Sequence, residues 1–225
     1  MDYRIISIGA LSRHPLWPND SGGRSAHATT TLVRSAGRTI LVDPALPGQI
    51  LDARLRERAG LGLGDVSDVF LTNFRPAHRR GLAALEHAKW WISEEEREVI
   101  GVNLIGQLQS VGAEDAQTEQ MLKTDIALLQ RCKAAPDRLA EQVDLFPLSG
   151  FTPGTCGLLL GLSQATVLIA GDAVATVEHL ERGQVLQGAA DVDAARGALA
   201  EVIEIADWII PGHDNIVPNL TRRPF

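Results

Sequence analysis

The sequence has few of the features that mark secreted, membrane or nucleic-acid-binding proteins. Its 225 residues include two cysteines, Cys132 and Cys156, too few for a disulfide framework and without a second cysteine at metal-ligand spacing. No basic run is longer than the pairs at 79–80 and 222–223, and the net charge is −7, so we expect no nucleic-acid partner. These absences favour a reducing compartment, and we expect a cytoplasmic protein.

Long apolar runs are absent as well. The most apolar window, 158–177, is interrupted by Gln164, Gly171 and Asp172, whereas a membrane span needs about 20 predominantly apolar residues. The first residues, MDYRIISIGAL, carry an aspartate where a signal peptide has positive charge. We therefore expect no membrane segment and no secretion signal.

Hydrophobic residues make up 45% of the chain, which is enough for a substantial core. No linker rich in proline, glycine or serine divides the sequence, so we predict one domain over residues 1–225. Short β-rich runs lie at both ends and helical patterns lie in the middle. Hairpins are predicted within 29–42 and 157–170, and helices over 47–59, 79–87, 191–206 and, in two pieces that divide near Gly112 and Ala113, over 93–135.

Three polar side chains, His78, Asp172 and His213, each lie in a loop just beyond a short apolar strand. Loops of this kind can converge at one edge of a sheet, where two imidazoles and a carboxylate could hold one divalent metal ion with open positions. By spacing alone, ordinary turns at Gly171-Asp172 and Gly212-His213 are the simpler interpretation, since such pairs are common turn material.

Five segments give these positions a wider context. In chain order they are TTTLVRSAGRTILVDPA, DVFLTNFRPAHRRGLAAL, LSGFTPGTCGLLL, VLIAGDAV and WIIPGHDNIV, and together they resemble the metallo-β-lactamase superfamily over almost the whole chain. The resemblance implies an α/β (α+β) fold, a four-layer αβ/βα sandwich of two mixed sheets between outer helices. The segment 93–135 would then be a helical insert in the family's variable region.

The sequence departs from the family's metal-binding motifs at four positions. Asn73 and Arg75 stand where the first two histidines belong, Ala77 stands where an aspartate belongs, and Phe151 stands where the next histidine belongs. The resemblance therefore implies a degraded motif, and we expect no dinuclear centre. These four side chains would line the former active-site cleft.

The remaining ligand positions of the family are intact. His78, Asp172 and His213 match its ligands, and Asp43 matches the aspartate that ends its first hairpin. If the protein is an active enzyme, these three ligands would be its catalytic residues and would hold one zinc or iron ion. Asp43 would lie in the cleft behind them.

Arg75 leads to the sharpest prediction. A guanidinium cannot ligate a metal and repels a cation, so we predict that Arg75 fills the vacated first site and pairs with Asp172 and also with Asp43. Carboxylates left buried without a partner would cost several kcal/mol. Phe151 would fill the remaining volume. The alternative is that Arg75 points to solvent, as loop arginines usually do.

Three functions follow from these patterns. The first is a pseudoenzyme that binds a small molecule or a partner in the former cleft, with no certain cofactor and homodimerisation as an expectation from base rates. The second is a mononuclear zinc or iron hydrolase or oxidoreductase; His14 and His27 are candidate further ligands, although we expect both on the surface. The third, a serine or cysteine hydrolase, lacks a G-x-S-x-G motif and any sign of a base near Cys156.

Overall fold

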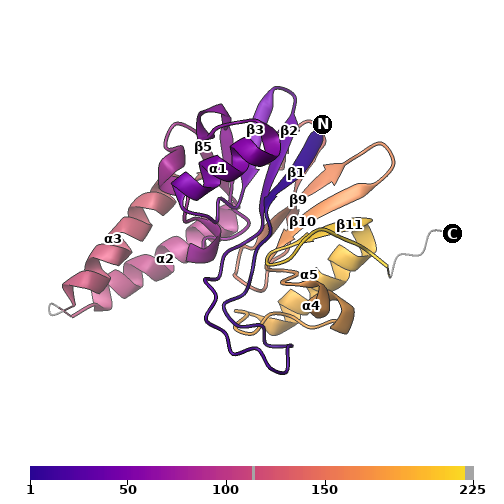
Figure 1. Ribbon diagram of the computed structural model, residues 1–225. Coiled ribbons are helices and arrows are strands. Elements are labelled where there is room, and N and C mark those ends of the chain that lie inside the picture. The colour runs from indigo at the N-terminus through magenta and orange to yellow at the C-terminus, as the bar shows by residue number, and fades with distance from the viewer. Residues whose placement is uncertain (113–114, 221–225) are drawn as a thin grey trace.

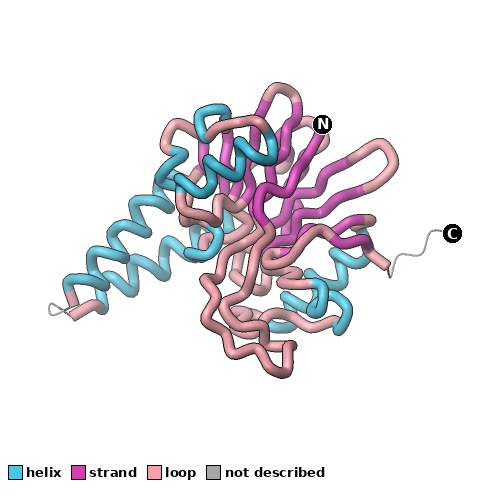
Figure 2. Tube along the Cα trace, viewed as in Figure 1, coloured by secondary structure: helices cyan, strands magenta, loops and turns pink. Residues whose placement is uncertain are grey.

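Two six-stranded mixed sheets face each other and carry helices on their outer faces, as Figures 1 and 2 show for the computed structural model. The structure describes residues 1–112 and 115–220. The predicted α/β (α+β) sandwich is confirmed. The first sheet has the order β1 (Asp2–Ser7), β2 (Thr30–Ser35), β3 (Arg38–Val42), β4 (Asp68–Phe70), β5 (Lys89–Ile92) and β6 (Lys133–Ala134). The second has the order β12 (Val217–Pro218), β11 (Trp208–Pro211), β10 (Thr166–Gly171), β9 (Cys156–Gly161), β8 (Val143–Pro147) and β7 (Arg138–Ala140).

Both predicted hairpins are present. β2 and β3 pair antiparallel in the first sheet, and β9 and β10 do so in the second. The turn between β2 and β3 consists of Ala36 and Gly37, whose φ angles of 48° and 76° suit a tight two-residue connection. The two hairpins set the register of β3 and β10, the strands that Asp43 and Asp172 follow.

The parallel strands of each sheet bring several chain segments to one edge. β3, β4 and β5 run parallel, with Val42 beside Phe70 and Phe70 beside Trp91. In the second sheet β10 and β11 run parallel, with Gly171 beside Pro211. The residues that follow these strands therefore emerge close together, which is where the fold places its polar loops.

The outer layers are helical. On the first sheet lie α1 (Gly48–Ala59), α2 (Glu94–Ser110) and α3 (Ala116–Arg131), and on the second lie α4 (Val177–Arg182) and α5 (Val192–Ile205) (Figure 1). The helices predicted over 47–59 and 191–206 are confirmed, and α2 and α3 lie within 93–135, but Ala113, at the predicted division, lies outside the described residues. No pattern predicted α4. In the described part of the chain, no helix has both the length and the apolar composition to cross a membrane.

The helix predicted over 79–87 is wrong. Only one 3-10 turn, η3 (Leu82–Leu85), forms there. The backbone is held by the loop after β3 instead, because Gly81 donates its N–H to the carbonyl of Pro44 at 2.8 Å. The packing is close enough that a Cβ on Gly81 would lie 2.6 Å from the carbonyl oxygen of Leu46. These tertiary contacts override the local helical pattern.

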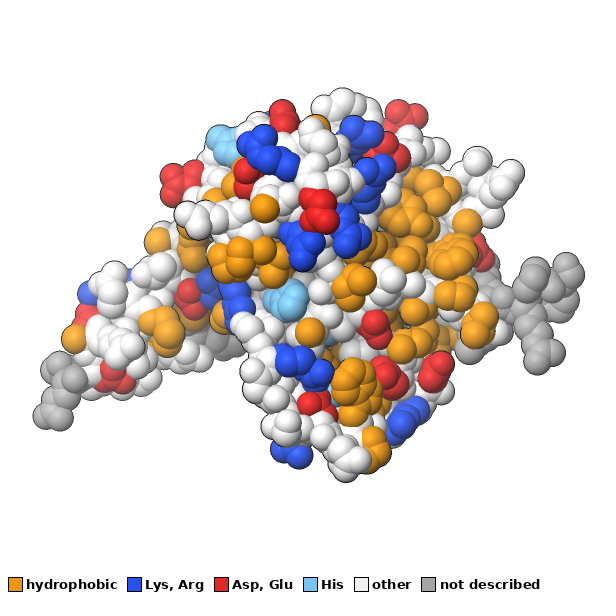
Figure 3. Space-filling view, in the orientation of Figure 1, with side chains coloured by type: hydrophobic (Ala, Val, Ile, Leu, Met, Phe, Trp, Pro, Cys, Tyr) orange, Lys and Arg blue, Asp and Glu red, His pale blue; other side chains and the backbone are white. Residues whose placement is uncertain are grey.

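The central core lies between the two sheets. Val33, Ile40 and Phe70 come from the first sheet, and Leu158 and Ile169 from the second, and all are buried. Figure 3 shows the edge of this layer, where hydrophobic side chains gather between β1 and the β9–β10 hairpin. Burial of these side chains from both sheets stabilises the sandwich and thereby positions the loops at its edge.

We expect Phe70→Ala to lower the free energy of unfolding by about 3–5 kcal/mol, because it leaves a cavity between the sheets. Urea unfolding followed by circular dichroism measures the change. Val102→Ala, at a 71% exposed position of α2, is the control and should change stability by less than about 0.5 kcal/mol. Equal effects of the two substitutions would contradict the assignment of Phe70 to the core.

Candidate functional site

Four polar side chains follow strands that end at the same edge of the sandwich. Asp43 comes directly after β3, and Asp172 comes directly after β10. His78 ends the 3-10 turn η2 (Pro76–His78) after β4, and His213 comes two residues after β11. The first sheet thus supplies Asp43 and His78, and the second supplies Asp172 and His213.

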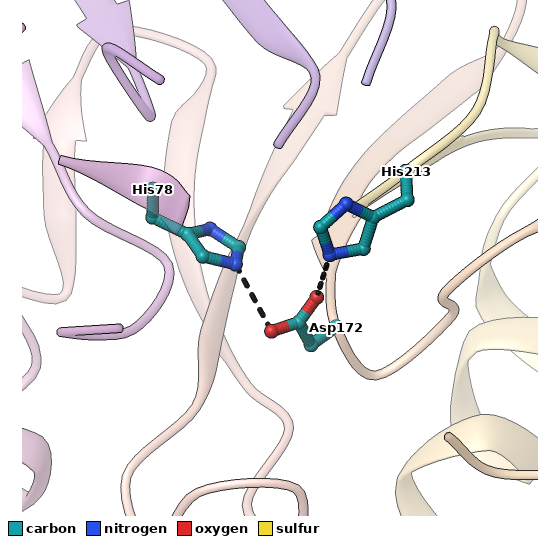
Figure 4. Close-up of side chains that lie close together, drawn as sticks. All are labelled: His78, Asp172 and His213. Carbon is teal, nitrogen blue, oxygen red and sulfur yellow. Dashed lines mark hydrogen bonds and ion pairs between the residues drawn. The ribbon is translucent and has the colours of Figure 1, made fainter. Parts of the chain in front are cut away.

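The carboxylate of Asp172 lies between two imidazoles, as Figure 4 shows. Its Oδ2 is 3.0 Å from Nε2 of His78, and its Oδ1 is 3.0 Å from Nε2 of His213. All three side chains are buried, and each offers one ligand atom within 4.8 Å of the others. The structure therefore brings together the three residues proposed as ligands, which we call the central cluster.

Each histidine of the central cluster is held from behind by an acceptor. Nδ1 of His78 is 3.0 Å from Oδ2 of Asp43, and Nδ1 of His213 is 2.9 Å from the carbonyl oxygen of His27. A carboxylate or a carbonyl oxygen can only accept, so Nδ1 of both rings carries the proton. Nε2 of both rings consequently faces Asp172, in the orientation that second-layer contacts impose on metal-binding histidines.

Asp43 is itself fixed in place. It is buried, and its two carboxylate oxygens accept the N–H and the hydroxyl of Thr72 at 2.9 and 2.7 Å. Its φ of 49° lies in the left-handed region, which aspartate tolerates better than most residues. Asp43 is therefore a positioning residue behind His78.

The cluster shifts the pKa values of its members. Burial opposes the charged form of His78, but the carboxylates of Asp172 and Asp43 outweigh burial and raise the pKa of His78 to about 10. Burial would likewise raise the pKa of Asp172, but attraction to His78 and contact with His213 hold that pKa well below its usual range. Asp172 is thus an anion, and His78 carries a proton on Nε2 unless a cation takes the proton's place.

Two glycines allow this close approach. Gly171 has a φ of 54°, and a Cβ there would lie 2.6 Å from the hydroxyl oxygen of Thr72. A Cβ on Gly212 would lie 2.8 Å from Oδ1 of Asp172. The pairs Gly171-Asp172 and Gly212-His213 are therefore parts of the site rather than ordinary surface turns.

Comparison with solved structures identifies the architecture. No family model matches the chain, and no curated protein sequence matches it. A candidate metallo-β-lactamase from Thermotoga maritima superposes with a TM-score of 0.68 at 17% identity, over 96% of this chain and 98% of that one. The chain has the metallo-β-lactamase fold.

Lactonases are among the other proteins with this fold. AidC, a dizinc quorum-quenching lactonase, matches with a TM-score of 0.63 at 18% identity, over 79% of this chain and 67% of that one. AiiA from B. thuringiensis, solved as a mutant with N-decanoyl-L-homoserine bound at its active site, matches with a TM-score of 0.63 at 17% identity, over 94% and 92% of the two chains. At these identities the likeness shows the fold alone.

The donor atoms of the central cluster fit one divalent metal ion. Two imidazole nitrogens and a carboxylate are ligands that both zinc and iron accept. Oδ1 of Asp172 is buried and accepts no hydrogen bond of good geometry, although Nε2 of His213 lies 3.0 Å away. An ion bound here would take the place of the proton on Nε2 of His78 and could use the unsatisfied Oδ1 of Asp172 as a ligand.

The family resemblance assigns Asn73, Ala77 and Phe151 to further positions of the metal-binding motifs. Asn73 is buried, and its amide donates a hydrogen bond to Oδ2 of Asp172 at 3.0 Å. Phe151 is also buried, and Ala77 lines the cavity with a methyl group. Among the described residues, the group with metal-binding geometry contains only His78, Asp172 and His213.

The predicted pairing of Arg75 with Asp172 and Asp43 is wrong. Arg75 is exposed, and its guanidinium carbon lies 4.8 Å from the centre of the Phe151 ring. Its side chain forms no ion pair with any residue that the structure describes. His78 takes the predicted place instead, since its compact ring contacts both carboxylates while fully buried.

Neither of the two further candidate ligands belongs to the group with metal-binding geometry. His14 is 4% exposed, so the expectation of a surface position is wrong, and its Nε2 lies 3.1 Å from the hydroxyl of Thr176. His27 is half-buried, and its ring contacts the carbonyl oxygens of Ser25 and Ile8. His27 contacts the site through its backbone carbonyl, which accepts a hydrogen bond from Nδ1 of His213.

Cys156 is unsuited to nucleophilic catalysis, as the sequence predicts. Its side chain is buried at the start of β9, and burial raises the pKa of its thiol to about 12. The thiolate required for attack is therefore not formed at neutral pH.

A cavity of about 510 Å³ opens above the central cluster. His78, Asp172 and His213 line it together with residues of the long connection between β1 and β2, which extends below the sheets in Figure 1. Within this connection the Trp17 ring stacks on His14 at 4.4 Å. The cavity is large enough for a small organic molecule.

Glu96 joins two loops of the site, although no sequence pattern marked it as a site residue. This fully buried carboxylate accepts the N–H of Phe74 at 2.9 Å and the N–H of Gly154 at 3.0 Å. Ser93 caps the helix by accepting the N–H of Glu96 at 3.2 Å. The run of three glutamates after Ser93 indicates a helix start, but it cannot show which glutamate turns inward.

We expect Glu96→Gln to lower the free energy of unfolding by about 1–3 kcal/mol, because one buried N–H would then face an amide NH₂ group. Chemical denaturation measures the change. Glu94→Gln, an exposed position in the same helical turn, is the control for the lost charge and should be nearly neutral. A larger effect at Glu94 than at Glu96 would contradict the role assigned to Glu96.

Glu178 ties the cavity wall to α4. Burial opposes its charge, but hydrogen bonds from Trp17 at 2.7 Å and Thr176 at 2.8 Å outweigh burial and lower the pKa of Glu178 to about 2. Because folding lowers the pKa of Glu178, its ionised form stabilises the folded state at pH values above 4.5, the ordinary pKa of the group. This contribution is lost as the pH falls toward 2.

We therefore expect Glu178→Gln to destabilise the protein at about pH 6, with the difference from wild type shrinking at about pH 3. Denaturant unfolding of both proteins at each pH measures the difference. Glu181→Gln, at an exposed position of the same helix, should show no such trend. A difference for Glu178→Gln that is constant across this range would refute the assigned contacts.

Proposed function

We propose that the protein binds a single divalent metal ion through His78, Asp172 and His213 and acts as a hydrolase on a small molecule held in the adjoining cavity. The observation that carries this proposal is the convergence of two Nε2 atoms on one buried carboxylate whose Oδ1 accepts no aligned hydrogen bond. Lactonases with the same fold, such as AidC and AiiA, bind small molecules, which supports the substrate size.

The residues of the chain have separate roles in this proposal. A zinc ion held by His78, Asp172 and His213 would supply Lewis-acid chemistry, which polarises a carbonyl group and lowers the pKa of water to about 7. Asp43 orients His78, and the His27 carbonyl orients His213. The Asn73 amide holds Oδ2 of Asp172 in place. Because these contacts exist before any ligand arrives, the donor atoms need little rearrangement.

A metal-free binding protein is the second candidate. It is favoured by the protonated His78, which bridges Asp172 and Asp43 and so neutralises part of their charge without a metal ion. In that case the same cavity binds a small molecule without chemistry. Metal content separates the two candidates.

We expect about one equivalent of zinc or iron in protein purified without chelators or a histidine tag, and much less in His213→Ala. Elemental analysis measures the metal content. His87→Ala, at an exposed position outside the cavity, is the matched control and should retain the metal content of wild type.

No bound metal in the wild-type protein, even after incubation with zinc, would exclude the metal-dependent proposal and leave the metal-free binding protein. Retention of metal by His213→Ala would show that the ion lies elsewhere. If the metal content behaves as expected, esters, lactones and thioesters form the first set of substrates to test.

A further inference from the structure

The wall of the cavity is charged differently from the protein as a whole. The chain has a net charge of −7, yet Arg13 and Arg75 line the cavity. Among the described residues that line it, Asp172 is the single acidic one, and its carboxylate already contacts the imidazoles of His78 and His213. The entrance therefore favours a ligand with negative charge.

The guanidinium of Arg75 is held in place but unpaired. It stacks on Phe151, whose ring is 3% exposed and therefore fixed by the packing around it. The Arg75 N–H donates to Oδ1 of Asn73 at 3.0 Å, which fixes the backbone as well. Within residues 1–112 and 115–220, the Arg75 side chain forms no hydrogen bond or ion pair, so its five donors are available to a ligand.

Apolar groups cover much of the remaining wall. Leu11, Pro15, Trp17 and Leu186 lie around the cavity, and the stacked face of Phe151 lies beside Arg75. A ligand that is anionic throughout would leave these surfaces without complementary contacts. The wall instead suits a molecule with one anionic end and an apolar body.

We propose that Arg75 is a specificity-determining residue that binds the carboxylate or phosphate group of a small substrate, with Arg13 as a second cation and with the substrate's apolar part against Trp17 and Leu186. A stacked, planar guanidinium offers two parallel N–H donors, which match either oxyanion. The inference rests on the proposed function in one respect: both place the substrate in this cavity.

The test uses ligand binding rather than turnover. Isothermal titration calorimetry on the full chain, freed of metal with a chelator that is then removed, compares phenylacetate, phenylphosphonate and the neutral phenylacetamide. We expect the two anions to bind at least about tenfold more tightly than the amide, as a charge-assisted hydrogen bond allows. The tighter anion identifies whether a carboxylate or a phosphate is preferred.

Variants assign the effect to Arg75. Arg75→Ala should weaken binding of the preferred anion by about 10- to 100-fold and leave phenylacetamide binding unchanged. Arg75→Lys keeps the charge but loses the planar fork, so its affinity should lie between those of wild type and Arg75→Ala. Arg58→Ala removes the same charge from the exposed end of α1 and should bind as wild type does.

Undetectable binding of both anions, affinity for both anions no higher than for phenylacetamide, or unchanged anion binding by Arg75→Ala would overturn the inference. Metal content, measured in parallel, separates it from the proposed function. A protein that binds zinc but does not discriminate between the probes refutes the inference alone. A protein that binds no zinc yet loses anion binding with Arg75→Ala refutes the metal-dependent function alone.

Discussion

The buried carboxylate of Asp172 is the constraint on which the rest of the site depends. A buried anion is costly unless it is paired, and its partners His78 and His213 come from different sheets. The two sheets must therefore pack in one register for the charge to be satisfied. The inter-sheet core around Phe70 provides this packing, and the ion pairs in turn favour one alignment of the loops at the sheet edge.

The cluster is surrounded by contacts that restrict its geometry. Asp43 and the His27 carbonyl accept from Nδ1 of His78 and His213 and so fix the orientation of the two rings. The Asn73 amide donates to one oxygen of Asp172. Glu96 ties the loop before His78 to the loop at Gly154 from the side of α2. A site ordered in this way favours ligand binding because little conformational entropy remains to be lost.

The protein shares its fold with lactonases, and Arg75 and Phe151 are among the residues that line the cavity above the cluster. Arg75 over Phe151 gives this wall a cation where the family resemblance predicts metal-binding histidines. Fold alone does not choose a substrate, so the chemistry of this wall carries more information about the ligand than the sandwich does.

Local strand patterns in the sequence determined the two hairpins. The ordered motifs, through their resemblance to a known family, indicated the α/β sandwich and the residues of the central cluster. Only the tertiary structure decided that Arg75 stacks on Phe151 while His78 bridges the carboxylates, and that Glu96 turns inward. Those outcomes depend on which side chain best satisfies a buried charge or N–H group, and the competing groups lie far apart in sequence.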